Sequence, residues 1–447
     1  MHLRLHLHLF LYFADQSLNM STTAVSNSSG AGSRARSFLV PFILVTMLFF
    51  LWAFVHNLEP ILIPHLKKAC QLTDLESALI DSAVYIGYFL MAIPAGLFMK
   101  RFGYKKGILL GLALYAGGAL LFLPAADYRV YGFFLGALFV IASGCAFLET
   151  AANPYVTILG PPEGATTRLN FAQSFNGLGA FLAPLLGGRL ILSGIEHTES
   201  ELQAMAPEQL EAYLQMEANA VKMPYLIIAL AVIAVGILFI FTWMPEVPQE
   251  TKAQRSSIAK ALRRKHLAWG VVAQFFYVGA QVCVTSFFIR FARFTSGTPE
   301  KDAALWLGFA MLGFMIGRFA GTLFTRFIPA HRLLAFYSLI CIVLLTIATF
   351  VRSEFAVWAV FAVPFFESIM FPTIFALAIK DLKEDTEIGS SLLVMAIAGG
   401  ALFPLFMGLI SDNLNIQVAY VVPLICFVFV WYFGWRGYRV VPASNPE

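Results

Sequence analysis

Long apolar runs alternate with short polar breaks along most of the chain. An α-helix needs roughly 20 apolar residues to cross a bilayer, and about twelve runs of that length follow one another between residues 37 and 438. The residue-by-residue alternation that marks the strands of a membrane β-barrel is absent from the sequence. The pattern therefore predicts an all-α integral membrane protein with twelve transmembrane helices.

Composition agrees with this prediction and excludes several kinds of chemistry. Hydrophobic residues make up 59% and charged residues 13% of the 447 positions, with a mean hydropathy of +0.76. The 33 glycines and 21 prolines are tolerated in membrane helices, where they permit close packing and local unwinding. The sequence contains no phosphate-binding Gly-x-x-x-x-Gly-Lys-Ser/Thr loop and no His-Glu-x-x-His zinc motif, and its five cysteines lack metal or disulfide spacing. We expect no enzyme, no metal, no cofactor and no nucleic-acid partner.

The second half of the sequence echoes the first. The stretch that begins Gly96-Leu-Phe-Met-Lys-Arg-Phe returns about half a chain length later as Gly321-Thr-Leu-Phe-Thr-Arg-Phe. Such repetition is typical of transporters built from two six-helix repeats, with the substrate near the midplane between them. The predicted parts are an N-terminal extension (1–36, with translation expected to start at Met20), a first bundle (37–245), a linker with an amphipathic helix (246–265), a second bundle (266–438) and a tail (439–447).

Charge in the polar breaks predicts an orientation. A basic turn at residues 100–106, the basic segment at residues 252–265, and Arg326 with Arg332 fall on one side, whereas a glutamate-rich loop at residues 194–222 falls on the other. Because cytoplasmic loops carry an excess of Lys and Arg, we expect both termini in the cytoplasm. The expected location is the plasma membrane of a bacterium, that is, its inner membrane.

Glu149 is the leading candidate for function. It lies well inside an apolar run, and a carboxylate at that depth costs at least ~2.5 kcal/mol, so its default interpretation is functional. A structural ion pair or a packing hydrogen bond is the alternative. The first span holds a second polar group, Trp52, Asn57 and Glu59, just before Pro60, which favours a bend. Asp81, near the outer end of the second span, is explained by its depth at the membrane interface.

Further polar and aromatic positions follow on later spans. Gln173 and Asn176 share a helix face, either as ligands or as packing contacts between helices. The second half carries Tyr277, Gln281 and Phe371. Glu367 is interpreted either as a second proton site or as the partner of Arg318. A sugar, with its ring of hydroxyls and an apolar face, suits such a mixture of amides, carboxylates and aromatic rings.

Several motifs resemble one known family. The turn from Gly96 to Lys106 is similar to the loop motif of the major facilitator superfamily, although Lys100 stands where that motif usually has aspartate. A closer resemblance is to the fucose-galactose-glucose-mannose symporter family, which includes the L-fucose/proton symporter. It rests on the stretches Leu148-Glu-Thr-Ala-Ala-Asn-Pro154, Leu159-Gly-Pro161, Arg168-Leu-Asn-Phe-Ala-Gln-Ser-Phe-Asn176, Ala273-Gln-Phe-Phe-Tyr-Val-Gly-Ala-Gln281 and Pro372-Thr-Ile-Phe375.

The resemblance implies that Glu149 takes part in proton coupling. It also implies a coupling aspartate on the first span, but Pro60 stands at that position and Glu59 is one residue earlier, a rotation of about 100° on a helix. Phe371 replaces an expected tyrosine, and Glu367 an expected neutral residue.

The predicted function is import of a hexose or deoxyhexose, L-fucose or a related monosaccharide, by proton symport with alternating access. We expect a monomer in the lipid bilayer. The predicted proton-coupling residues are Glu149 and Glu59, and the predicted sugar-binding residues are Trp52, Asn57, Glu59, Glu149, Gln173, Asn176, Tyr277, Gln281 and Phe371. Two alternatives stay open: sodium-coupled symport of glucose, galactose, mannose or N-acetylglucosamine, and a membrane sugar sensor that does not transport.

Overall fold

The computed structural model describes residues 38–160, 165–192, 197, 199–245, 261–325, 327–382 and 386–440. Four predictions lie wholly or mostly outside these ranges: the N-terminal extension, the linker up to residue 260, the position of Arg326, and the tail beyond residue 440. The domain boundaries set from the sequence stay predictions.

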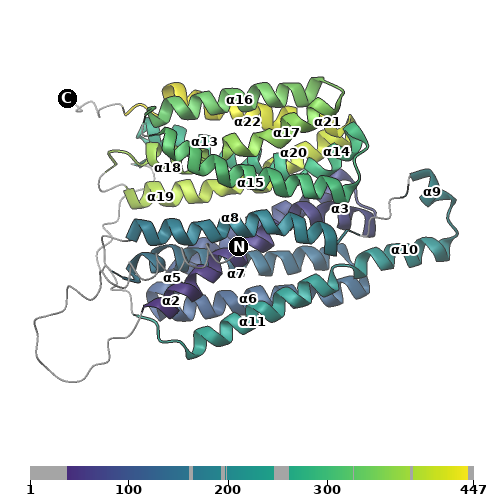
Figure 1. Cartoon of the computed structure of the whole chain (residues 1–447), viewed down its shortest axis with the longest axis horizontal. Helices are drawn as coiled ribbons and strands as arrows, with labels where there is room; N and C mark the ends of the chain where they lie inside the picture. Colours follow the sequence, from purple (N-terminus) through teal and green to yellow (C-terminus); the bar gives the residue numbers. More distant parts are fainter. Residues whose placement is uncertain are drawn as a thin grey trace, which may run out of the picture.

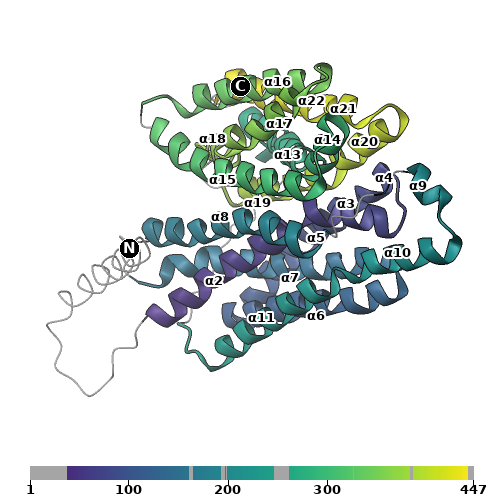
Figure 2. The ribbon, with the colours of Figure 1, turned by 45° about the vertical axis from the view of Figure 1, so that its right-hand side comes forward.

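The described helices form two groups that lie side by side (Figure 1), and the turned view separates the same two groups (Figure 2). The helices of the first group are α2 (Leu39–His56), α3 (Glu59–Ala69), α4 (Asp74–Ser77), α5 (Leu79–Phe102), α6 (Tyr104–Tyr128), α7 (Tyr131–Ile158), α8 (Ala165–Leu190), α9 (Glu199–Ala204), α10 (Pro207–Asn219) and α11 (Lys222–Phe241).

The helices of the second group follow the linker. They are α13 (Lys265–Ser286), α14 (Phe288–Ser296), α15 (Glu300–Phe324), α16 (Ala330–Phe350), α17 (Glu354–Glu367), α18 (Met370–Ala378), α19 (Thr386–Met395), the 3-10 turn η3 (Ala396–Ala398), α20 (Gly399–Asn413), α21 (Ile416–Ala419), α22 (Val421–Tyr432) and the π-helical turn η4 (Phe433–Gly437). We call the two groups the first and the second half.

The predicted all-α architecture of twelve spans is confirmed. Among the described residues, ten helical stretches are long and apolar enough to cross a membrane, and the pair α17 and α18, bent by 40°, makes an eleventh. The twelfth is α8, a helix of 26 residues whose apolar run is interrupted by Arg168, Gln173 and Asn176. These three polar residues lie in the N-terminal half of α8, and the amides of Gln173 and Asn176 are half-buried.

Two of the spans that carry candidate residues are broken. The first span stops at His56 and restarts at Glu59, so that the predicted bend falls at residues 57–58. Pro60 then occupies the first turn of α3, where its missing N–H leaves no hydrogen bond unmade. The tenth span breaks in the same way after Glu367, before α18. Each break ends a helix beside a glutamate.

The predicted acidic loop at residues 194–222 is largely helical. Its described part contains α9 and α10, and α10 runs on into α11 after a break at residues 220–221. Pro207 at the start and Glu208 in the first turn favour a helix, because proline is preset for the first turn and acids suit a helix N-terminus. The loop prediction was wrong because an amphipathic helix with a charged face has no continuous apolar run.

The two halves meet at one end through an ionic cluster. We call this end, where α3, α4, α14 and α21 lie, the distal end, and the end where α2 begins the proximal end (Figure 1). Asp74 of α4 is paired with Arg290 of α14 and accepts a hydrogen bond from Ser411 of α20. Arg290 also donates to Ser77 over 2.8 Å, and Asp412 accepts the backbone N–H groups of residues 74 and 75 over 2.7 and 2.8 Å. We call these five side chains the distal lock.

Further contacts reinforce the distal lock. Lys67 pairs with Asp74 within the first half, and Lys68 pairs with Glu300 across the halves. Gly408 lets the α20 backbone approach α4, since a Cβ there would lie 2.7 Å from the carbonyl oxygen of Asp74. Because buried charges that are paired are held firmly, these contacts stabilise a conformation in which the halves are joined at the distal end.

Asp81 differs from its predicted position. Its side chain is fully buried at the junction of the halves, instead of lying at a membrane interface, and it accepts a hydrogen bond of 2.8 Å from Ser286 of α13. The next residue, Ser82, donates to the carbonyl oxygen of Ala401 in α20 over 2.7 Å. The contact between α5 and the second half thus continues inward from the distal lock.

Replacing Arg290 by glutamine is expected to open the distal end. The variant leaves Asp74 with Lys67 and Ser411 but without its buried charged partner in the second half, which costs about 1–3 kcal/mol of the closed arrangement and shifts the populations by about fivefold or more. Electron-spin distance measurements between labels at the exposed Tyr128 and Leu414 report the separation of the halves.

The matched control is Arg129→Gln, which breaks the Arg129–Glu211 pair within the first half. We expect a longer label distance for Arg290→Gln only. Identical distance distributions in both variants would show that the distal lock does not hold the halves together.

Candidate functional site

Glu149 lies in the interior of α7 and is partly exposed. Its neighbours Leu148, Ala151 and Ala152 are fully buried, so the carboxyl group occupies the accessible side of an otherwise packed helix. One turn on, the amide of Asn153 donates to the Glu149 carbonyl oxygen over 3.1 Å. No basic side chain forms an ion pair with Glu149 among the described contacts, which leaves its carboxyl group able to gain or lose a proton.

The predicted amides of α8 lie beside this acid. Gln173 donates to the Asn153 side-chain oxygen over 3.4 Å, which links α8 to the turn of α7 that follows Glu149. Asn176 is half-buried on the same face as Gln173. The next residue, Gly177, packs against Met315 of α15 in the second half. Gln173 therefore lies next to the turn of α7 that follows Glu149, and the part of α8 around Asn176 lies near the boundary of the halves.

His56 joins the first span to the second. It ends α2, and its Nδ1 lies 3.1 Å from an oxygen of Glu59, the first residue of α3. Its Nε2 lies 3.0 Å from the hydroxyl oxygen of Tyr85 in α5. His56 is also within electrostatic range of Glu149. Neither His56 nor Tyr85 was among the predicted site residues, although the spacing of His56 and Glu59, three positions apart, could be read from the sequence.

Two residues of the first span that were predicted to bind sugar, Asn57 and Trp52, make contacts within their own helix. The Asn57 amide donates to the Ala53 carbonyl oxygen over 2.8 Å and so closes the last turn of α2. Trp52 is 4% exposed and packs on Phe49, with 4.4 Å between ring centroids. Neither side chain contacts Glu59 or Glu149 among the described interactions.

The second half contributes a separate group. The Tyr277 hydroxyl donates to the Glu367 carbonyl oxygen over 3.0 Å, at the break between α17 and α18. The ring of Phe371 lies 6.4 Å from that of Tyr277, and Gln281, one turn further along α13, is half-buried. Tyr277 thus fixes the break, while Phe371 and Gln281 have exposed surface.

Glu367 is fully buried, and within the described part of the chain neither carboxyl oxygen has a hydrogen-bond partner. Arg318 does not pair with it. The guanidinium donates to the Ser368 carbonyl oxygen over 3.3 Å and lies 4.9 Å above the ring of Phe314. Gln274 on α13 is likewise fully buried with both amide atoms unpartnered. These are polar groups that an apolar interior does not satisfy.

The arrangement suits a small polyhydroxylated ligand better than a metal. Within the described ranges, no group of three His, Cys, Asp or Glu side chains could hold a metal ion. Amides and carboxyl groups that are partly exposed inside a bundle offer the donors and acceptors that hydroxyl groups require.

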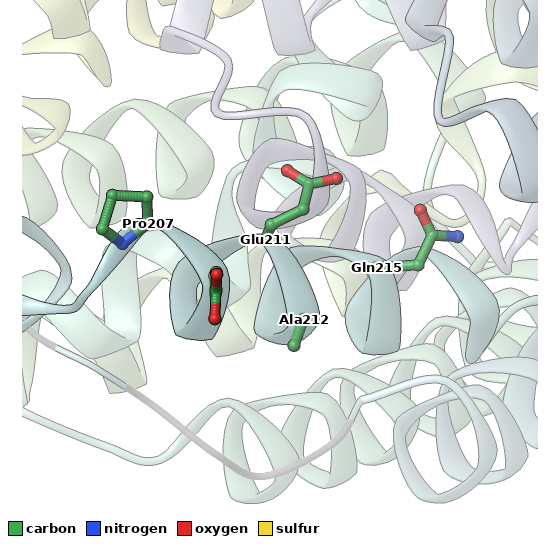
Figure 3. Close-up of a pocket in the computed structure, with 5 residues that line it drawn as sticks. Pro207, Glu211, Ala212 and Gln215 are labelled. Atoms are coloured by element: carbon green, nitrogen blue, oxygen red, sulfur yellow. The ribbon is translucent and has the colours of Figure 1, made fainter.

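A hollow on the surface of α10 is a poor alternative site. It is shallow and is lined by Pro207, Glu208, Glu211, Ala212 and Gln215 (Figure 3). Glu211 pairs with Arg129, and Gln215 donates to the Ala126 carbonyl oxygen over 2.9 Å, so these polar groups hold α10 against α6.

Comparison with known proteins agrees with the resemblance seen in the motifs. The sequence profile of the Major Facilitator Superfamily matches residues 38–396. The L-fucose-proton symporter of Escherichia coli K12 is 43% identical over 422 residues, which cover 92% of this chain and 96% of that protein. The glucose/galactose transporter of Brucella abortus biovar 1 is 42% identical over 396 residues, 88% of this chain and 93% of that protein.

Among solved structures, the transporter FucP in its outward conformation matches with a TM-score of 0.66 at 43% identity. The match covers 90% of this chain and 99% of that one. Profile, sequence and structure agree over nearly the whole length. The chain belongs to the major facilitator superfamily.

Proposed function

We propose that the protein is a secondary active transporter that imports a hexose or deoxyhexose together with a proton. The observation that carries the proposal is the partly exposed, unpaired Glu149 beside the amides of Asn153, Gln173 and Asn176. The names of the two similar curated proteins, an L-fucose-proton symporter and a glucose/galactose transporter, support both the substrate class and the coupling ion.

The proposed location is the bacterial inner membrane, with the proximal end in the cytoplasm. Arg101 and Lys106 are exposed at the proximal end, whereas Glu208 and Glu211 are exposed at the distal end. Positive charge gathers on the cytoplasmic side of membrane proteins, so this distribution supports cytoplasmic termini. The conformation with the distal lock formed is then the one closed to the outside.

Sugar binding uses the amides of the first half and the aromatic side of the second. The hydroxyl groups of a hexose donate to Glu149 and exchange hydrogen bonds with Gln173, Asn176 and Gln281, while Phe371 covers its apolar face. A ligand that contacts both halves stabilises the arrangement in which they approach each other. Alternating access follows when the halves rock around the bound sugar.

Coupling follows from the cost of a buried charge. With Glu149 ionised, closing the halves around it removes a charge from water, which an apolar site disfavours strongly. Once Glu149 is protonated it is neutral and can donate a hydrogen bond to the sugar. Proton and sugar together therefore permit the step that neither permits alone.

Sodium as the coupling ion is the second candidate, since carboxylate and carbonyl oxygens also bind it. A pH gradient imposed on liposomes that contain the purified protein separates the two. We expect uptake of at least one of L-fucose, galactose, glucose, mannose and N-acetylglucosamine when the outside is acidic, with no response to a sodium gradient at equal pH. Uptake driven by a sodium gradient alone would show that the coupling ion is sodium and not a proton. A sugar that binds without uptake under either gradient would indicate a sensor.

Glu149→Gln is expected to abolish accumulation and to leave exchange partly intact. The amide still hydrogen-bonds to sugar but cannot carry a proton at this position, so a pH gradient does much less work on the sugar. We expect a loss of accumulation of about tenfold or more, with counterflow exchange within about threefold of wild type, which corresponds to about 1.4 kcal/mol or more of coupling.

Glu208→Gln, at an exposed acid of α10, is the matched control and should behave as wild type. Accumulation by Glu149→Gln at the wild-type level would remove Glu149 from the coupling step.

Glu367 is proposed as a second proton site that is neutral when the distal end is closed. A protonated carboxyl and an amide have nearly the same shape and no charge, so Glu367→Gln should change the thermal midpoint of the detergent-solubilised protein by only a few degrees. If Glu367 were instead half of an ion pair with Arg318, Glu367→Gln and Arg318→Gln would each destabilise strongly. The double variant would then show a coupling energy above about 1 kcal/mol in a double-mutant cycle.

A further inference from the structure

The break in the first span brings a histidine and a glutamate together. His56 Nδ1 and Glu59 Oε1 are 3.1 Å apart, and the two residues flank the break at positions 57 and 58. The Glu59 side chain is only 7% exposed, whereas 33% of the His56 side chain is exposed. The pair therefore joins an inaccessible carboxyl group to a ring that water can reach.

The two ring nitrogens of His56 have different neighbours. Nε2 lies within hydrogen-bond distance of the Tyr85 hydroxyl at 3.0 Å, whereas Nδ1 lies 3.1 Å from a Glu59 oxygen without the alignment of a hydrogen bond. A neutral imidazole has one donor and one acceptor nitrogen, whereas a protonated one has two donors. A proton on this ring therefore reverses the direction of the hydrogen bond to Tyr85, because Nε2 changes from acceptor to donor.

The other ionisable groups around His56 come from three helices. Besides Glu59 on α3, Asp81, Tyr85 and Tyr88 face it from α5 and Glu149 from α7. Tyr277 of α13 lies within electrostatic range of Tyr85. The acids near His56 are Glu59, Asp81 and Glu149, and no basic side chain is among the groups that act on it in the described structure.

Tyr85 connects the pair to the second half. Its ring packs on Gly400 of α20 so closely that a Cβ at Gly400 would lie 2.7 Å from a ring carbon. Ser82, one turn earlier on α5, donates to the Ala401 carbonyl oxygen over 2.7 Å. A change in the hydrogen bonding of the Tyr85 hydroxyl therefore occurs where the two halves touch.

We propose that His56 carries a transported proton, as a protonation site paired with Glu59, and that Tyr85 passes the protonation state of the ring to the contact between the halves. The proposal rests on the proposed function, which it extends by a proton-carrying residue and a residue that positions the contact.

One proton is gained per cycle at this site. In the deprotonated state, the Tyr85 hydroxyl donates to Nε2, and Nδ1–H lies beside the Glu59 carboxylate. A proton taken from water binds Nε2, which then donates to the Tyr85 oxygen. The His56–Glu59 pair becomes neutral overall, and the Tyr85 hydroxyl keeps its hydrogen but turns it away from Nε2. The proton leaves from Nε2 to water when the site opens on the other side, which restores the first state.

His56→Gln tests the proposal in liposomes that contain the full chain. Glutamine can donate to Glu59 and accept from Tyr85, so it imitates the neutral ring but binds no proton. We expect pH-driven accumulation of the transported sugar to fall about tenfold or more while counterflow exchange stays within about threefold. We also expect the exchange rate to lose most of its dependence on pH between about 5.5 and 7.5, where histidine titrates.

His65→Gln is the matched control, because His65 forms a second buried pair, with Glu217 of α10 at 3.4 Å, away from the site. It should keep the wild-type pH profile. If His56→Gln is unstable, the same measurements are made on Glu59→Gln and Tyr85→Phe. Glu59→Gln should flatten the profile, and Tyr85→Phe should keep the profile but uncouple accumulation.

A wild-type pH profile and accumulation ratio in His56→Gln would overturn the proposal. When His56→Gln is unstable, the same result in Glu59→Gln would overturn it. Absence of pH-driven accumulation by the wild-type protein would instead overturn the proposed function itself, so the two failures are distinguishable.

Discussion

The cost of holding a carboxyl group in an apolar bundle governs the whole molecule. A buried charge without a partner is strongly disfavoured, and the acids of this protein meet that cost in different ways. Asp74 is paired with Arg290 and Lys67, Glu59 is paired with His56, and Glu367 has no partner among the described residues. A paired acid can stay charged, whereas an unpaired one must be neutral or exposed. Whether each acid can stay charged therefore depends on whether it has a partner or access to water.

These acids are placed where the two halves meet or come close. The distal lock joins α4 to α14 and α20, and Asp81 joins α5 to Ser286 of α13. Deeper in, Tyr85 touches Gly400 and holds His56 with its other contact. Charge pairs at the distal end join the two halves, and the protonatable groups lie further inside the contact. Under the proposed proton coupling, this division lets a proton control a motion of whole helices.

The sequence predicted the spans correctly and singled out one acid as a candidate, for a physical reason. Crossing a bilayer demands continuous apolar runs, which are visible in one dimension, and an acid inside such a run, like Glu149, is conspicuous. Contacts between distant spans are not visible in this way. Asp74 and Arg290 are 216 positions apart, and Asp81, predicted at an interface, proved to face Ser286. The helix α10 was missed because its apolar residues are spaced along one face.

Sugar-driven proton entry tests the central claim, that proton and sugar cross together, most directly. The protein is placed in liposomes with equal pH on both sides, a pH-sensitive dye inside, and potassium with valinomycin to fix the membrane potential. Adding the transported sugar outside should acidify the lumen at a rate proportional to sugar uptake. Sugar entry with no change in the internal pH would contradict proton coupling.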